Sequence, residues 1–307
     1  MQPDNLTDVI EFVLFGFQGS LKQRGLLFCL LLVAFWATLC GNLLIVLLVS
    51  TSNNLHTPMY FFISQLSISD ILITSDIVPN LLRTLLNNGG TITFINCMIQ
   101  FYFFCAAEMF ECLLLMVMSY HRYVAICNPL RYSCIMTNGH CMRLVVSSWL
   151  ISFSTAFVDT FSASRLKFCG SKIIDHLLCD LVPLQEISCS DTFPIKLQLY
   201  LLSIPFVIIP SLIIVISYVK IIHAILQIPS NISRQKAFST CSSHLIVVSI
   251  FYWTMFSVYV VPTKGRTLTM SKILSLLYSV FTPLINPIIY SLRNKDIIKA
   301  IQEAIDM

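Results

Sequence analysis

Charged residues are scarce in this sequence of 307 residues: Asp, Glu, Lys and Arg make up only 11% of it. Soluble domains carry about 25% charged residues, which cover a surface that faces water. The hydrophobic content is 56%, and the mean hydropathy is +0.81. We therefore expect an integral membrane protein and exclude a soluble globular domain.

Signatures of several other protein classes are missing as well. The net charge of +4 contains no basic run, so nucleic acid is not an expected partner. Residues 1–24 are mixed and polar and lack the basic-then-apolar pattern of a signal peptide. No HExxH metal motif or GxSxG nucleophile elbow occurs, which argues against an enzyme.

Long apolar runs are what the sequence has in abundance. About 20 apolar residues cross the hydrocarbon core of a bilayer as a helix. Seven runs reach that length, near residues 25–50, 58–86, 95–127, 140–162, 196–228, 236–262 and 269–292. The predicted fold class is all-α, a seven-transmembrane helix bundle in the lipid bilayer.

A short tail follows the last run. Its isoleucines recur at helical spacing, which predicts an amphipathic helix on the membrane surface: Ile297, Ile298, Ile301 and Ile305. The expected organisation is an extracellular N-terminus (1–24), a seven-transmembrane domain (25–292) and a cytoplasmic amphipathic helix with its tail (293–307). An odd number of spans places the two termini on opposite sides.

The sidedness of the chain cannot be taken from its basic residues. Lys and Arg usually favour cytoplasmic loops, but with the N-terminus outside they divide nine to ten between inner and outer segments. The triplet Asn5-Leu6-Thr7 is an N-glycosylation sequon, which functions on the lumenal side. It predicts glycosylation at Asn5 and an extracellular N-terminus.

Four cysteines fall on the sequon's side of the membrane. Cys97 lies at the start of the third run, and Cys169, Cys179 and Cys189 lie in the long segment 163–195. Clustered cysteines in an oxidising compartment predict two disulfides. The alternative is that they are incidental thiols.

Six stretches, taken in order, resemble one family. They are GNLLIV (41–46), PMYFFISQLSISD (58–70), SYHRYVAICNPLRY (119–132), SY (217–218), KAFSTCSSHL (236–245) and PLINPIIYSLRN (283–294). The chain is identified from them as an odorant receptor of the rhodopsin-like G-protein-coupled class, and the likeness starts at EFVLFGF (11–17).

The resemblance implies a plasma-membrane receptor that binds small volatile organic ligands. It implies coupling to a stimulatory olfactory G protein, production of cyclic AMP, and no cofactor beyond a structural sodium ion. It also implies the disulfide pairing Cys97–Cys179 and Cys169–Cys189.

The sequence departs from the family pattern at three places. His121 stands where the family has Asp, Trp253 stands where it has Gly, and the first inner loop STSNNLHT lacks a basic residue. These departures affect the expected strength and resting level of signalling and leave the fold unchanged.

Two carboxyl groups are expected at a similar depth in the bilayer. Asp70 lies about 18 Å from the inner end of the second span, and Glu111 about 16 Å from the same end of the third. Two close carboxylates need a cation or a shared proton. The resemblance places them in a sodium-type state switch with Asn42 and Asn286, near the bend at Pro287. The alternative is that both acids are protonated and hydrogen-bonded.

Glu108 lies one helical turn from Glu111, at the depth of a ligand pocket. We expect it either to contact a polar or cationic odorant group or to join the ion cluster of Glu111. The other expected pocket residues of the third span are Phe104, Cys105, Met109 and Cys112. By family position, the resemblance implies Leu202, Ser203 and Phe206 from the fifth span and Tyr252 and Tyr259 from the sixth. Each of the aromatic side chains could equally serve in helix packing.

At the inner end, the resemblance assigns Arg122 to G-protein contact. Related receptors hold this arginine at rest with an adjacent acid, which neutral His121 cannot replace. We expect either a weaker resting lock or a poorly coupling receptor. Residues expected to join the active-state network or to contact the G protein are Tyr123, Tyr218, Lys236 and Tyr290.

A competing hypothesis is a membrane transporter or channel with Asp70, Glu108 and Glu111 along an ion path. The odd number of spans and the lack of an internal repeat argue against it.

Overall fold

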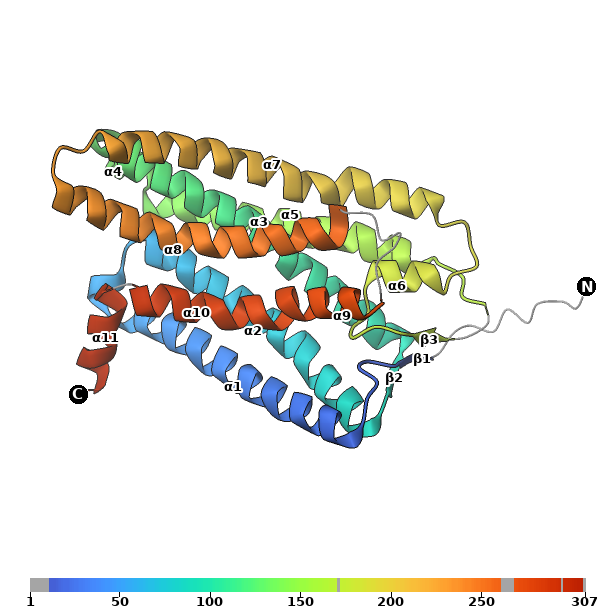
Figure 1. Ribbon diagram of the computed structural model, residues 1–307. Helices are drawn as coiled ribbons and strands as arrows, with labels where there is room; N and C mark the ends of the chain where they lie inside the picture. Colours follow the sequence, from blue (N-terminus) through green and yellow to red (C-terminus); the bar gives the residue numbers. More distant parts are fainter. Residues whose placement is uncertain (1–10, 170–171, 261–267, 294, 306–307) are drawn as a thin grey trace, which may run out of the picture.

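The computed structural model describes residues 11–169, 172–260, 268–293 and 295–305. The expected seven spans are confirmed within these residues. They are α1 (Leu21–Thr51), α2 (Pro58–Asn87), α3 (Phe94–Cys127), α5 (Asn138–Ser164), α7 (Phe193–Leu226), α8 (Asn231–Met255, continued by the π-helical η3, Phe256–Val260), and α9 (Leu268–Leu276) joined to α10 (Thr282–Arg293) by the π-helical η4 (Leu277–Phe281). In Figure 1 these helices lie side by side along one axis.

Local sequence signals account for several helix ends. Ser20 and Gln23 form a reciprocal capping box at the start of α1. Pro58 occupies the first turn of α2, where its missing N–H costs nothing. After α2, Asn88 and Gly89 adopt positive φ angles of 54° and 122°, which turn the chain sharply. Pro129 stops α3 after Asn128.

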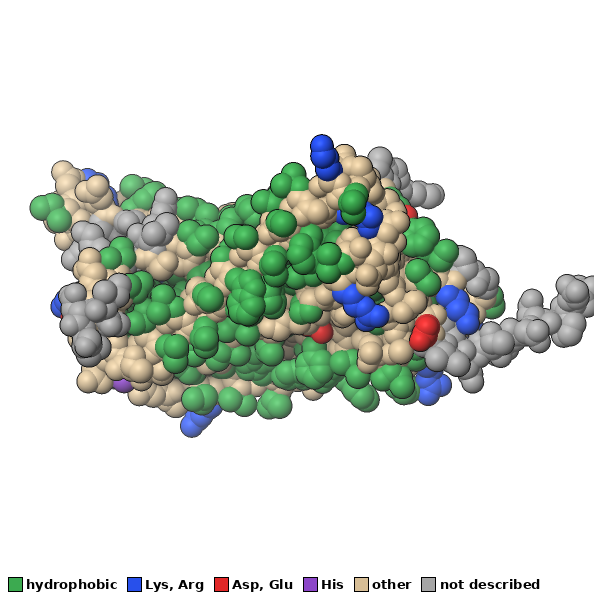
Figure 2. Space-filling view, turned by 90° about the horizontal axis from the view of Figure 1, so that it is seen from below, with side chains coloured by type: hydrophobic (Ala, Val, Ile, Leu, Met, Phe, Trp, Pro, Cys, Tyr) green, Lys and Arg blue, Asp and Glu red, His purple; other side chains and the backbone are tan. Residues whose placement is uncertain are grey.

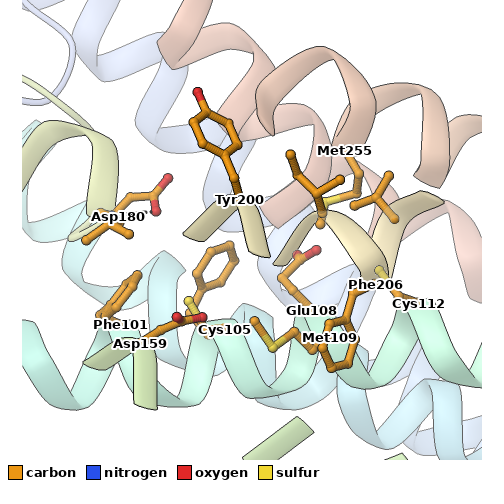
Figure 3. A pocket seen from close by; sticks show the side chains of 14 residues that line it. Phe101, Cys105, Glu108, Met109, Cys112, Asp159, Asp180, Tyr200, Phe206 and Met255 are labelled. Carbon is orange, nitrogen blue, oxygen red and sulfur yellow. Dashed lines mark hydrogen bonds between the residues drawn. The ribbon is translucent and has the colours of Figure 1, made fainter. Parts of the chain in front are cut away.

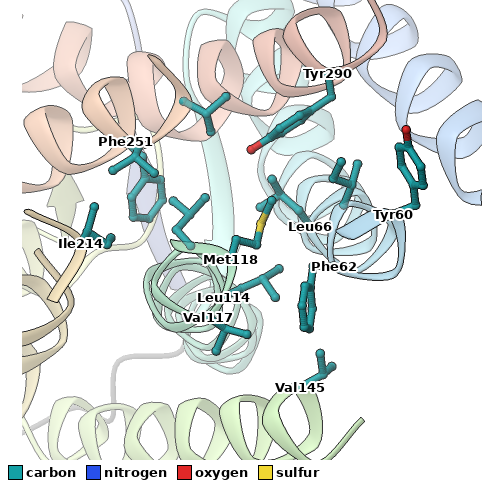
Figure 4. Close-up of a cluster of buried hydrophobic side chains, with 14 of the residues drawn as sticks. Tyr60, Phe62, Leu66, Leu114, Val117, Met118, Val145, Ile214, Phe251 and Tyr290 are labelled. Atoms are coloured by element: carbon teal, nitrogen blue, oxygen red, sulfur yellow. The ribbon is translucent and has the colours of Figure 1, made fainter. Parts of the chain in front are cut away.

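α3 is the central helix of the bundle. In the most apolar window of α3, 72% of the residues are buried inside the protein, compared with 19% for α7. Figure 4 shows Leu114, Val117 and Met118 of α3 at the middle of a hydrophobic cluster. Side chains of five other helices surround them: Phe62, Leu66, Val145, Ile214, Phe251 and Tyr290. A functional group on α3 is therefore within reach of most other spans.

A small sheet covers the end of the bundle that carries the N-terminus. Its strand order is β2 (Gly90–Thr93), β1 (Glu11–Leu14), β3 (Ile173–Ile174). β1 pairs antiparallel with β2 and parallel with β3. The segment after β3 leads into the short helix α6 (Leu181–Glu186). We call this covered region the N-terminal end of the bundle.

Shorter elements lie at the opposite end. They are the 3-10 turns η1 (Asn53–Leu55) and η2 (Pro129–Arg131), α4 (Tyr132–Ile135) and the tail helix α11 (Lys295–Ile305), which lies across the bundle axis in Figure 1. α11 buries Ile297 and Ala300 and exposes Ile298. Tyr60 of α2 donates a hydrogen bond of 2.8 Å to Asp296. The tail is therefore an amphipathic helix held against α2.

The outer surface of the spans is apolar. Large hydrophobic side chains such as Leu43, Leu150 and Val215 are exposed on α1, α5 and α7. Figure 2 shows hydrophobic side chains over the middle of the face that it presents. Lys and Arg gather on that face mainly toward the N-terminal end. This surface suits a lipid environment.

Candidate functional site

A cavity lies near the N-terminal end, between α3, α7 and α8 and beneath α6 (Figure 3). It holds about 680 Å³ of empty space, its open mouth included. Six of its lining side chains are among the predicted pocket residues: Phe104, Cys105, Glu108, Met109, Cys112 and Phe206. The five predicted residues of α3 recur at helical spacing and form the face of that helix that borders the cavity.

Eight further side chains line the cavity: Phe101, Asp159, Asp180, Leu181, Tyr200, Ile204, Val207 and Met255. On α7, Tyr200, Ile204 and Val207 follow helical spacing and share one face. Leu202 is not among the side chains that line this cavity, although Phe206, four residues further along α7, is. The side chains of Ser203 and Tyr259 lie outside the described part of the structure.

Tyr252 is not a lining residue, contrary to the prediction, and lies just below the cavity. Its hydroxyl donates a hydrogen bond of 2.7 Å to the carbonyl oxygen of Cys112. Cys112 itself borders the cavity, and Met255 borders it one turn along α8 from Tyr252. Tyr252 therefore joins α8 to α3 directly beneath the cavity.

Three carboxyl groups border the cavity, and they are buried to a similar degree. Glu108, Asp159 and Asp180 have exposed fractions of 3%, 3% and 4%. Asp159 accepts a hydrogen bond of 3.2 Å from Gln198, and Asp180 accepts one of 2.7 Å from the backbone N–H of Leu181. Both oxygens of Glu108 are buried, and neither has a hydrogen-bond partner in the part of the chain that the structure describes. Burial raises the pKa of the Asp180 carboxyl to about 6.

The segment above the cavity is tied to the bundle by covalent and polar contacts. Disulfides join Cys97 to Cys179 and Cys169 to Cys189, the pairing that the resemblance implied. The side chain of Gln100 accepts a hydrogen bond of 3.1 Å from the N–H of Cys179 and donates one of 3.1 Å to the carbonyl of Asp76. A Gln in an apolar run gave no sequence signal for this role.

A buried lysine ties the N-terminal segment to the last span. Lys272 of α9 is 6% exposed. It donates to Asp175 at 2.5 Å and to the carbonyl oxygen of Gly16 at 2.7 Å. Gly16 has a φ of +61°, and a Cβ there would meet Thr84 at 2.7 Å, so glycine is required. Neighbouring His176 is buried, which lowers the pKa of its imidazole to about 4.

Three of the four predicted state-switch residues, Asp70, Glu111 and Asn286, meet in the middle of the bundle. Asn286 of α10 donates to both oxygens of Asp70, at 3.0 and 3.1 Å. The side chains of Asp70 and Glu111 are hydrogen-bonding neighbours, which requires a shared proton or a cation between them. One oxygen of Glu111 is buried without a partner.

Asn42 contacts the bend of α10 at Pro287 through its amide N–H groups. Pro287 has no N–H, so the carbonyl of Pro283 loses its helical partner. Asn42 donates to that carbonyl at 3.1 Å and to the carbonyl of Thr38 at 3.1 Å. It therefore stabilises the bend of α10 from α1, with no hydrogen bond to Asp70 among the described contacts.

Oxygen donors of this kind suit a hard cation such as sodium. The buried oxygens of Glu111 and Asn42 that lack partners fit that requirement. In the described residues, however, no three His, Cys, Asp or Glu side chains are grouped for a metal ion. The protein ligands would be two carboxylates completed by neutral oxygens.

Arg122 is buried at the opposite end of the bundle. It is 7% exposed, its Nε has no partner, and its side chain bonds to Cys241 of α8. In the part of the chain that the structure describes, no carboxylate lies within 4.0 Å of it. His121 instead bonds through Nε2 to the hydroxyl of Tyr132 at 2.9 Å.

The tyrosines expected in the active-state network differ in their contacts. Tyr218 bonds to Nδ1 of His244 at 2.6 Å, which joins α7 to α8. The buried hydroxyl of Tyr290 has no partner. The ring of Tyr123 has the Lys220 ammonium 5.5 Å from its centroid. The side chain of Lys236 lies outside the described part of the structure.

Comparison with known proteins places this arrangement in a family. The sequence model of the family described as olfactory receptor matches residues 28–306. The chain belongs to the olfactory receptor family. Human olfactory receptor 11L1 is 45% identical to this receptor, and the match covers 99% of this chain and 94% of the human protein. Human olfactory receptor 11H4 is 45% identical over 97% and 92%.

The fold agrees with that family. The crystal structure of squid rhodopsin superposes on the receptor with a TM-score of 0.74 at 18% identity, covering 94% of this chain and 87% of the rhodopsin. The protein is a multi-pass G-protein-coupled receptor of the plasma membrane with a small-molecule ligand and a G-protein partner, and it is not an enzyme. The family favours an odorant receptor over the transporter or channel.

Proposed function

We propose that the cavity between α3, α7 and α8 binds small volatile organic molecules from the extracellular side and that ligand binding activates a stimulatory olfactory G protein. The single observation that supports this most is the mostly apolar cavity beneath a disulfide-tethered segment. Ligand pockets combine such a lining with a few polar groups. The proposed product of signalling is cyclic AMP.

The proposed orientation has the N-terminus outside. The N-terminal end carries both disulfides, which form and persist in oxidising compartments. The predicted sequon at Asn5 lies outside the described residues. The end with Arg122 then faces the cytosol, where a G protein can reach it.

The proposed mechanism transmits ligand binding along α8. A ligand in the cavity touches Met255 and Cys112, and Tyr252 joins the same two helices one turn below. A shift of α8 against α3 breaks the Tyr252–Cys112 bond. At the cytosolic end, the same shift separates Cys241 from Arg122 and frees the guanidinium for the G protein. The ligand favours this state only by its differential affinity for it.

The Asp70 cluster is the proposed state switch. Asn286 connects it to α10, and Glu111 connects it to the helix that borders the cavity. A sodium ion held by Asp70 and Glu111 would supply the charge that two adjacent carboxylates need. Rearrangement of α10 at Pro287 would break the Asp70–Asn286 contact and disperse the cluster.

The test is a cyclic AMP assay across a broad odorant panel in cells that display the receptor at their surface. Arg122→Ala, which leaves the cavity intact, is the matched control. We expect at least one odorant to raise cyclic AMP through wild-type receptor and not through Arg122→Ala. Loss of the signal in cells without the stimulatory α subunit identifies the G protein. Responses carried equally by Arg122→Ala would contradict the proposal.

A further inference from the structure

The strongest polar groups in the lining of the cavity are carboxyl groups. Its lining includes three carboxyl groups, from Glu108, Asp159 and Asp180, and among the described lining residues there is no Lys, Arg or His. The donors among the described lining side chains are the Tyr200 hydroxyl and the thiols of Cys105 and Cys112, and thiols are weak donors. A ligand that fills this cavity must therefore bring donors of its own.

Glu108 is the group that most needs such a donor. It is 3% exposed, and neither of its oxygens has a hydrogen-bond partner among the described residues. Figure 3 shows its carboxyl group pointing into the cavity between α3 and the α7–α8 side. A buried polar group without a partner costs free energy, and a charged one costs more. A donor on a ligand in the cavity would satisfy these two oxygens.

Asp159 and Asp180 have a different part. Each already accepts a hydrogen bond from the protein, from Gln198 and from the N–H of Leu181. The charge of Asp180 still acts at a distance, because the apolar lining screens it poorly. Burial raises the pKa of Asp180 to about 6, so this group is mostly ionised at the neutral pH outside the cell. The mouth of the cavity is therefore negative.

From this geometry we infer that the receptor's ligand is a small protonated amine, whose ammonium group pairs with Glu108 while its hydrocarbon part packs against Phe206, Val207 and Met255. An ammonium group supplies up to three N–H donors and a positive charge, which can balance the negative charge of a carboxylate. Alcohols of the same shape supply one donor and no charge. The inference rests on the proposed function and names the ligand class of the same cavity.

The test uses pairs of compounds matched in shape: cyclohexylamine with cyclohexanol, and isopentylamine with isopentanol. Primary alkylamines are protonated at pH 7.4, as the Lys side chain is. Full-length receptor is measured in two ways, by cyclic AMP in cells and by thermal unfolding after purification. We expect each amine to be at least tenfold more potent than its alcohol, a difference of about 1.4 kcal/mol. Each amine should also raise the unfolding temperature.

Three variants sharpen the test. Glu108→Gln should abolish the preference for amines, and Glu108→Asp should restore most of it. Asp191→Asn is the matched control, because it removes one exposed carboxylate at the N-terminal end without bordering the cavity. It should keep the preference. If Glu108→Gln does not reach the surface, the unfolding comparison of amine and alcohol on wild-type receptor still decides.

The outcomes separate this inference from the proposed function. Activation by alcohols, esters or acids with no advantage for amines overturns the amine assignment and leaves the odorant receptor in place. Amine stabilisation without cyclic AMP supports the amine assignment and contradicts the coupling. The amine assignment also fails if sodium chloride at equal concentration stabilises the receptor as much as the amine does, or if no amine stabilises it.

Discussion

Replacing His121 by Asp should lower the ligand-free production of cyclic AMP. In the structure His121 faces Tyr132 and Phe62, and no carboxylate lies within 4.0 Å of Arg122 in the described chain. The substitution places an acid next to this arginine. Both positions are more than nine-tenths buried, with exposed fractions of 6% and 7%.

The size of the effect follows from the value of one ion pair. An exposed pair is worth about 0.2–1 kcal/mol, and shielding from water increases this. If the pair forms only in the resting state, it shifts the resting-to-active ratio by its own free energy. At about 1.4 kcal/mol per tenfold change, a pair worth about 1 kcal/mol reduces a small active fraction about fivefold.

The assay is basal cyclic AMP normalised to surface receptor. Two controls separate charge from the lost contact with Tyr132. His121→Asn has the shape of the aspartate without its charge, and Tyr132→Phe removes the same hydrogen bond while keeping His121. Both controls should leave basal cyclic AMP within about twofold of wild type, since a neutral hydrogen bond contributes about 0.5–1.5 kcal/mol that both signalling states share.

Unchanged or raised basal cyclic AMP in His121→Asp would show that the lack of an acid at position 121 does not weaken the resting state. Another contact would then hold Arg122 at rest, and the bond to Cys241 of α8 is the one that the structure offers. An equal fall in His121→Asp and His121→Asn would show that the packing of His121, and not charge, sets the resting level.

Three further predictions concern the segment above the cavity. Cys179→Ser should remove most surface expression, because a native disulfide contributes about 2–5 kcal/mol. The control Cys134→Ser, at an exposed free cysteine, should keep normal surface expression. A free Cys97 or Cys179 thiol in peptide mapping of wild-type receptor from the cell surface would contradict the pairing. Asp175→Asn should lower the unfolding temperature more than Glu303→Gln at the exposed pair with Lys299, because buried Lys272 keeps only the Gly16 carbonyl; equal shifts would refute this. Asp180→Asn should be more stable than wild type at pH 7.5, and the difference in their free energies of unfolding should shrink toward pH 5. The reason is that the folded-state pKa of Asp180 is about 6, above the ordinary 3.8, so its ionised form destabilises the fold and acid removes this cost. A difference that grows in acid would show that burial does not disfavour the charge of Asp180.

The spans could be predicted from the sequence because the bilayer requires long apolar runs. The expected run 95–127 became Phe94–Cys127, and 58–86 became Pro58–Asn87. The start of the sixth span was placed five residues late, because residues 231–235 (NISRQ) are polar, yet α8 begins at Asn231, where Ser230 caps it. Capping, and not hydropathy, sets that boundary.

The small sheet could not be predicted. β1 pairs with residues about 80 and 160 positions away in the sequence. Its four residues are too few for an alternating hydrophobic pattern to identify a strand. The same limit applies to the cavity. Depth along α3 found Glu108, but Asp159 and Asp180 lie on other elements, and only the packing of α5 and α6 brings them to it.

We propose that Glu108 belongs to the ligand cavity and Glu111 to the state switch, although the two are only one helical turn apart. Concentration–response curves for a set of agonists on Glu108→Gln and Glu111→Gln receptors, corrected for surface expression, test it directly. Glu108→Gln should change which odorants activate the receptor, because its carboxyl group borders the cavity. Glu111→Gln should alter signalling for every agonist, because its partner is Asp70. The same uniform loss across ligands in both variants would contradict the account and place Glu108 in the ion cluster.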